Sequence, residues 1–81
     1  MRRLFSIAAA AKFLGLPSAQ PIYYAHRSGR LPFVEQIGRV HVIPGDRLED
    51  LLRVIGPQLR AVDYVTAAQR VSQIYADVIE V

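Results

Sequence analysis

The sequence predicts a mostly α-helical fold with one small β-hairpin. Apolar residues recur at helical spacing in four segments, and all five glycines fall between those segments. Two apolar, β-branched runs meet at a Gly-Arg turn, which is typical of a hairpin. A chain of 81 residues without cysteine forms a small domain with a marginal core and no disulfide to brace it.

The first helix is expected from Ile7 to Leu14. Ser6 is a suitable N-cap, because its hydroxyl can accept a hydrogen bond from a free backbone N–H two or three residues on. Four consecutive alanines favour helix, and Gly15 is expected to end it in a left-handed conformation. The residues that share its apolar face are Ile7, Ala10, Ala11 and Leu14.

The second helix is expected to follow the connection Leu16-Pro17. Ser18 or Gln20 caps it, Pro21 stands in its first turn, and the helix runs to about Ser28 and stops at Gly29. By spacing, its inner face holds Ile22, Ala25 and His26, whereas Tyr23, Tyr24 and Arg27 lie largely away from it.

A hairpin is expected next, from strands Leu31–Ile37 and Val40–Ile43 with Gly38-Arg39 as the turn. Pro32 restricts the first strand to a sheet edge because it has no N–H to donate. Pro44 ends the second strand.

Two more helices complete the pattern. The third is expected from Asp46 to about Ile55, and Gly56-Pro57 breaks it. Gln58 to Ile79 then forms one long helical pattern of about 22 residues, which spans roughly 33 Å.

This order of elements is that of a winged helix-turn-helix in residues 1–55, followed by an amphipathic helix in residues 58–80. Such a unit places its second helix in a DNA major groove and its wing beside the phosphates. Residues 1–43 carry six basic groups and one acid, whereas residues 44–81 carry four basic groups and six acids. A basic front is expected of a phosphate-binding face, although scattered solvated charges would give the same count.

Several segments of the chain resemble the excisionase and MerR-like winged-helix DNA-binding families. Ser6–Gly15 is similar to their first helix and turn, and Arg27–Pro32 is similar to the end of their recognition helix. The remaining similar motifs are Gly38-Arg39, Ile43-Pro44 and Leu48–Leu52, which correspond to the wing turn, the wing exit and the following helix. The resemblance covers residues 5–53. It implies dimerisation through the helix that follows the domain, as in MerR-like regulators and some phage terminase small subunits.

The chain departs from the family pattern at three places. Pro17 lengthens the turn by one residue, and Ala19-Gln20-Pro21 stand where the family usually has more basic residues. Val40 and Val42 occupy wing positions where arginine or aromatic residues are common. A weakly basic recognition helix and an apolar wing favour a protein-interaction role as the alternative.

Four residues of the second helix are candidates for reading bases. Glutamine can bond adenine at two points and arginine can bond guanine at two points, while tyrosine can donate to phosphate or pack on a thymine methyl. The alternative is that one of the two tyrosines packs in the core beneath the wing. Tyr23 is a stronger candidate for that position than Tyr24. The candidates are Gln20, Tyr23, Tyr24 and Arg27.

Further residues are candidates for the DNA backbone. Ser18 would offer its hydroxyl and neighbouring N–H groups at a helix N-terminus, or act only as a cap. Arg39 at the wing tip would reach a phosphate or the minor groove, or else be a solvated turn arginine. Lys12, Arg30 and His41 complete the candidate set.

No feature of the sequence predicts catalysis or a cofactor. Two histidines without cysteine or a carboxylate pattern make no metal site, and His26 is expected to be a half-buried, satisfied side chain. The sequence has no phosphate loop and no nucleophile motif. We therefore expect no enzyme, no cofactor and no small-molecule substrate.

The stripe of the C-terminal helix has three interpretations. It packs on its own domain, pairs with a second copy, or binds another protein or a membrane surface. A homodimer is favoured, because two half-sites would combine the few base contacts of one short helix. The stripe residues are Tyr64, Ala68, Val71, Tyr75 and Val78.

The sequence therefore predicts a protein that binds double-stranded DNA in a sequence-specific way. It would act as a dimer, as a small transcriptional regulator or as an excisionase-like architectural factor. No apolar run approaches the roughly 20 residues of a membrane span, so a cytoplasmic protein is expected. The alternatives are a protein-interaction module (an antitoxin, adaptor or virion component) and a DNA recognition factor similar to a phage terminase small subunit.

Overall fold

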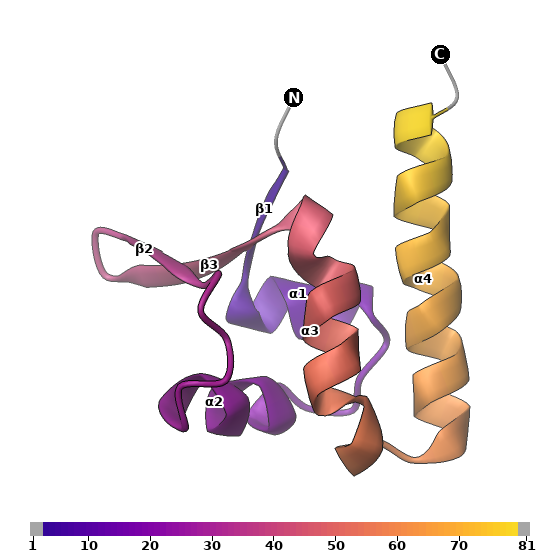
Figure 1. The fold of residues 1–81 in the computed structure, drawn as a ribbon, viewed down its shortest axis with the longest axis horizontal. Helices are drawn as coiled ribbons and strands as arrows, with labels where there is room; N and C mark the ends of the chain where they lie inside the picture. Colours follow the sequence, from indigo (N-terminus) through magenta and orange to yellow (C-terminus); the bar gives the residue numbers. More distant parts are fainter. Residues whose placement is uncertain (1–2, 80–81) are drawn as a thin grey trace.

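The computed structural model describes the backbone of residues 3–79 and the side chains of residues 3–73. The fold is mostly helical with one small antiparallel sheet, which confirms the predicted fold class (Figure 1). Two short 3-10 turns, Gly45–Arg47 and Gly56–Gln58, flank the third helix. The other elements, in chain order, are β1 (Leu4–Ser6), α1 (Ile7–Phe13), α2 (Gln20–Arg27), β2 (Glu35–Ile37), β3 (Val40–Pro44), α3 (Leu48–Ile55) and α4 (Ala61–Ile79).

The sheet has three strands in the order β1-β3-β2, all antiparallel. The predicted hairpin is confirmed, with Ile37 opposite Val40 across the Gly38-Arg39 turn. Strand β1 was not predicted: it pairs with the free edge of β3 and sets Phe5 opposite Ile43. A two-stranded hairpin is marginal by itself, so this third strand anchors the wing to the domain.

Three elements begin later than predicted. The first wing strand begins at Glu35, because Leu31 is buried in the core at 4% exposure and the chain turns between Leu31 and Val34. The third helix begins at Leu48, because Gly45–Arg47 form a 3-10 turn before it, in which the Gly45 N–H donates to the Arg3 carbonyl at 2.6 Å. The last helix begins at Ala61, because the backbone of Leu59 is extended and separates this helix from the preceding 3-10 turn. The end of the predicted segment 58–80, residue 80, lies outside the described residues.

Local capping fixes both ends of α1, which begins at Ile7 as predicted and ends at Phe13, one residue before the predicted Leu14. The Ser6 hydroxyl accepts a hydrogen bond from the Ala9 N–H at 3.1 Å, and Gly15 follows the helix with φ of 75°. A Cβ atom at Gly15 would lie 3.1 Å from Cγ2 of Thr66. The turn between α1 and α2 therefore packs directly on α4.

One apolar core joins the sheet to all four helices. The described residues include no buried polar or charged side chain. Ala67 and Val71 of α4 join this core at 0% and 5% exposure. The largest fully buried side chains are Leu14, Ile22, Ile43, Leu48, Leu51, Ile55 and Pro44.

Ala67 of α4 belongs to the core although it is not one of the predicted stripe residues. It is fully buried. Helix α4 packs beside α3 (Figure 1), and Ala67 lies in the core cluster that both helices share. At least part of α4 therefore folds back on its own domain.

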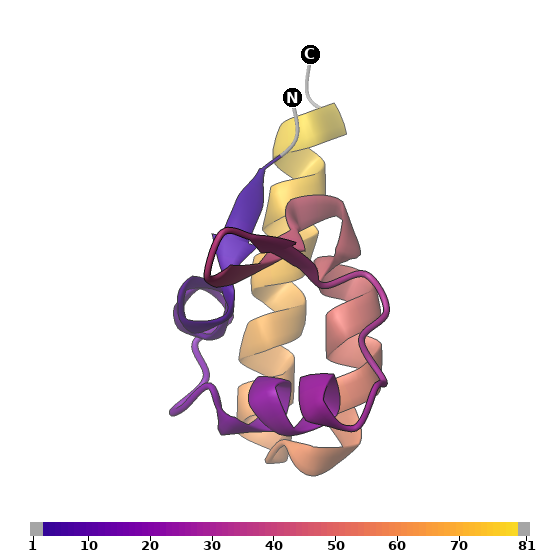
Figure 2. The same cartoon turned by 90° about the vertical axis from the view of Figure 1, so that its left-hand side faces the viewer.

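Helix α2 and the β2–β3 wing project on the same side of the molecule. Figure 1 shows both at the left, with α4 at the opposite side, and Figure 2 looks directly at the wing above α2. This arrangement presents two separate surfaces, one made by α2 and the wing and one made by α3 and α4.

Candidate nucleic-acid interface

The outer face of α2 carries the four predicted base-reading residues. Gln20, Tyr23, Tyr24 and Arg27 are all exposed. The two tyrosines are 45% and 55% exposed, so neither is a core residue and the alternative that buried Tyr23 is wrong. On the opposite face of the helix, Ile22 and Ala25 are fully buried.

The start of α2 is held by local contacts. Ala19 occupies the N-cap position, and Gln20 is the first helical residue rather than the cap. The exposed Ser18 hydroxyl accepts a hydrogen bond from the Gln20 N–H at 3.3 Å. Pro21 stands in the first turn as predicted, where a missing N–H costs nothing.

The wing presents one cation between two apolar side chains. Arg39 is exposed at the turn, and the neighbouring Ile37 and Val40 are 55% and 51% exposed. The Gln36 amide donates to the Gly38 carbonyl at 3.1 Å and so ties the turn. The wing tip is therefore one arginine on a largely apolar hairpin.

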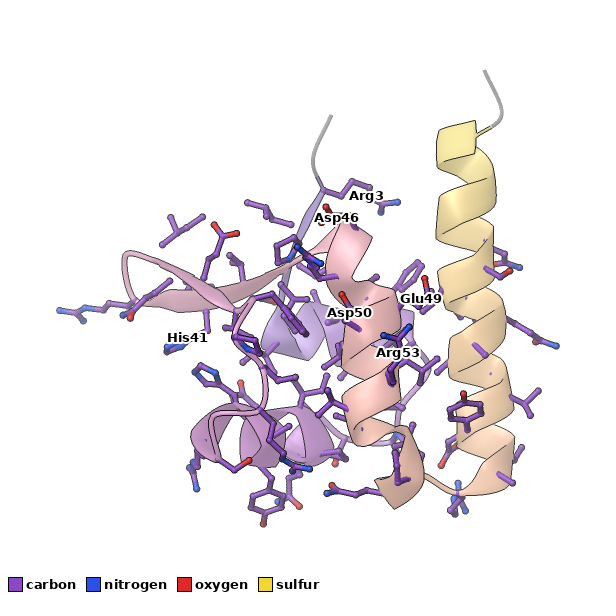
Figure 3. All side chains as sticks on the ribbon, in the orientation of Figure 1. Arg3, His41, Asp46, Glu49, Asp50 and Arg53 are labelled. Carbon is purple, nitrogen blue, oxygen red and sulfur yellow. The ribbon has the colours of Figure 1, made fainter. Side chains whose placement is uncertain are left out.

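A pair of histidines joins the wing to α2. The ring centroids of His26 and His41 lie 4.8 Å apart with the planes inclined by 59°. Figure 3 shows His41 below the wing, on its side facing α2. Both residues are half-buried, as expected for His26. His41 thus lies against α2, and a contact of its ring with phosphate stays a prediction.

The alternation of residues along β3 indicates the direction of one member of this pair, His41. His41 and Ile43 are two residues apart on β3, so they share a face of the sheet, and Ile43 is fully buried. That alternation directs His41 inward. It does not say that the inward neighbour is His26.

Three arginines on the α3–α4 side have acidic partners, whereas Arg70 of α4 has no ion pair among the described residues. Asp50 forms ion pairs with Arg47 and Arg53, each at 3.2 Å, and Asp63 forms one with Arg60 at 2.9 Å. The hydrogen bond and the charge of Asp63 raise the pKa of Arg60. Figure 3 shows Glu49, Asp50 and Arg53 on α3, away from the wing tip.

The cations near α2 and the wing have no such partners. Among residues 3–73, neither Arg27 nor Arg39 forms an ion pair, and the Arg30 Nε donates only to the Ser28 hydroxyl at 2.9 Å. Lys12, exposed near the end of α1, is likewise without a described carboxylate partner. Arg27 and Arg39 therefore place positive charge on α2 and the wing that no described carboxylate pairs with.

Three of the predicted dimerisation residues, Tyr64, Ala68 and Val71, line a groove between α3 and α4. The groove holds about 310 Å³. Val71 is 5% exposed and so serves chiefly the chain's own core, whereas Tyr64 is 44% exposed, with its ring against Gly56. The side chains of Tyr75 and Val78 lie outside the described ones. The groove is lined by Glu49, Leu52, Arg53, Tyr64, Ala68, Val71 and Ser72.

A second apolar surface on α4 was missed by the sequence analysis. Val62 and Val65 are 62% and 54% exposed. Their spacing of three residues, followed by Ala68 at the next i+3 position, was the available signal.

Comparison with family models, curated proteins and solved structures found no match to this chain. Among the described helices, none is both long enough and apolar enough to cross a membrane. Within the described residues, no three His, Asp or Glu side chains are grouped so that they could hold a metal ion.

Proposed function

We propose that this protein binds double-stranded DNA, with α2 in the major groove and the wing beside the phosphate backbone. The distribution of ion pairs is the observation that carries the proposal. On the α3–α4 side Arg47, Arg53 and Arg60 are paired with acids and only Arg70 of the described arginines is not, whereas Arg27, Arg30 and Arg39 all lack an ion-pair partner among the described residues. A polyanion is the ligand that such a surface attracts most strongly.

The placement of the two elements agrees with this proposal. A winged helix-turn-helix contacts DNA with its recognition helix and its wing together, and here both project on one side (Figure 2). The outer face of α2 combines an amide, two phenols and a guanidinium, which bond base edges and phosphates.

A homodimer is part of the proposal. An eight-residue recognition helix makes few base contacts, and two copies on adjacent half-sites would combine their affinities. The exposed apolar residues Val62, Tyr64 and Val65 on α4 support a second copy as the partner of this helix. The protein would then act in the cytoplasm as a small transcriptional regulator or an excisionase-like architectural factor.

Fluorescence anisotropy with a random-sequence duplex tests the proposal. We expect affinity to fall steeply between 50 and 200 mM salt, because binding releases counterions from the phosphates. Arg39→Ala should weaken binding to all sequences alike and reduce the salt slope by about 1. Arg53→Ala is the matched control, since Arg53 is paired with Asp50 on the other side.

Two results would contradict the proposal. One is a folded protein that does not bind the duplex even at 50 mM salt. The other is an equal loss of affinity for Arg39→Ala and Arg53→Ala, which would mean that the unpaired cations on α2 and the wing have no special part in binding.

A protein-interaction module is the second candidate function. The observation that favours it is the exposed apolar surface on the wing, where Ile37 and Val40 are both more than half exposed. An antitoxin, an adaptor or a virion component would use such a surface, and a terminase small subunit would use DNA binding to recruit an enzyme. Absence of DNA binding by the folded protein would favour this candidate.

A further inference from the structure

The four exposed residues of α2 are not equivalent in direction. In an α-helix each residue is rotated by about 100° from the last. The buried Ile22 and Ala25 define the inner direction of α2. Gln20 and Arg27 then lie within about 10° of the direction opposite to the buried face. Tyr23 and Tyr24 lie about 50° to either side of this outward direction.

The histidine contact shows which flank faces the wing. His26 is on the Tyr23 side of α2, and its ring meets His41 of β3. Tyr23 is therefore on the flank nearer the wing, and Tyr24 is on the far flank. The major groove is about 12 Å wide and a helix with its side chains nearly fills it, so residues on the flanks face the groove walls.

The two central residues also differ in position along the helix axis. Gln20 and Arg27 are seven residues apart, which is about 10.5 Å at 1.5 Å per residue. Successive base pairs rise by about 3.4 Å. The two side chains therefore reach base pairs that are separated by about three steps.

We propose that Gln20 and Arg27 are the base-reading pair of α2, and that the DNA half-site contains an A·T pair and a G·C pair about three base pairs apart. This inference rests on the proposed function. Glutamine pairs with the adenine edge and arginine with the guanine edge, and no described carboxylate competes for the Arg27 guanidinium. Tyr23 and Tyr24 donate their hydroxyls to phosphates on the two walls and set affinity without choosing sequence.

Selection from a randomised duplex library, followed by competition titrations, tests this assignment. The selected half-site should contain an adenine and a guanine at the stated separation. Gln20→Ala and Arg27→Ala should each reduce discrimination at one position by about 5- to 150-fold. Gln20→Arg should change the preferred base from adenine to guanine at the position that Gln20→Ala relaxes.

Phenylalanine substitutions of the tyrosines provide the matched controls. Tyr23→Phe and Tyr24→Phe keep the ring and remove only the hydroxyl, so they should weaken binding to selected and random duplexes by the same factor. A change in base preference with either variant, comparable to that of Arg27→Ala, would overturn the division of roles. So would a selected site without the adenine and guanine.

The random duplex separates failure of this inference from failure of the proposed function. Salt-dependent binding without the predicted half-site overturns only the base-reading assignment. Loss of all binding, with circular dichroism showing a folded protein, overturns both.

Discussion

Val71→Ala tests whether α4 belongs to the core of its own chain. Val71 is 5% exposed and lies in the core cluster with Ala67. The substitution removes two buried methyl groups, each worth about 0.8 kcal/mol in transfer free energy. An incompletely closed cavity adds to this loss, so we expect the free energy of unfolding to fall by about 2 kcal/mol.

Val65→Ala is the matched control on the same helix. It makes the same chemical change at a side chain that is 54% exposed. Both substitutions raise helix propensity by a few tenths of a kcal/mol, so this gain cancels in the comparison. We expect Val65→Ala to change the free energy of unfolding by less than about 0.5 kcal/mol.

Thermal and urea unfolding at two protein concentrations measure the difference. For a domain of this size 1 kcal/mol corresponds to about 4–8 °C in Tm, so Val71→Ala should lower Tm by about 8–16 °C. The shift should be independent of concentration if Val71 packs within one chain. Equal Tm values for the two variants, or a difference that vanishes on dilution, would refute the assignment of this face to the core.

Substitutions at Gly15, Gly29 and Ser6 test local features of the helix-turn-helix. Gly15→Ala and Gly29→Ala both force alanine into a positive φ, at 75° and 76°, but only at Gly15 would the new Cβ approach another side chain, Thr66 at 3.1 Å. Urea unfolding should show a loss of about 1–2 kcal/mol for Gly29→Ala and a larger loss for Gly15→Ala; equal losses would argue against close packing of the turn on α4. Ser6→Ala removes the cap of α1 and should lower the free energy of unfolding by about 1 kcal/mol, whereas Ser6→Asp, which keeps an acceptor oxygen, should retain most of it.

The features predicted correctly from the sequence are those that depend on neighbouring residues. The Ser6 cap, the Gly15 stop and the Gly38-Arg39 turn each arise within a few residues, and all are present. The exposure of Arg27 also followed from helical spacing alone. Local chemistry and periodicity decide these features, so one sequence is sufficient to predict them.

The features missed depend on which distant segments meet. Strand β1 exists because β3 offers it a free edge, and nothing in residues 4–6 alone states that they pair with residues 42–44. The burial of Ala67 likewise depends on where α4 lies against the domain. The contact of His26 with His41 combines both kinds of information, because it needs the inward face of β3 and the position of α2. Periodicity predicts the faces of an element but not its neighbours.

Residues far from the outer face of α2 decide whether that face can bind DNA. An isolated helix of eight residues is unstable in water, so the burial of Ile22 and Ala25 must hold α2 in place. The turn before it is packed on α4 through Gly15 and Thr66, and the wing is in contact with it through the histidine pair. Binding groups must be held to within about 0.5 Å of their productive positions. Loosening α4 is therefore expected to weaken sequence discrimination at α2, although α4 lies on the opposite side of the molecule (Figure 1).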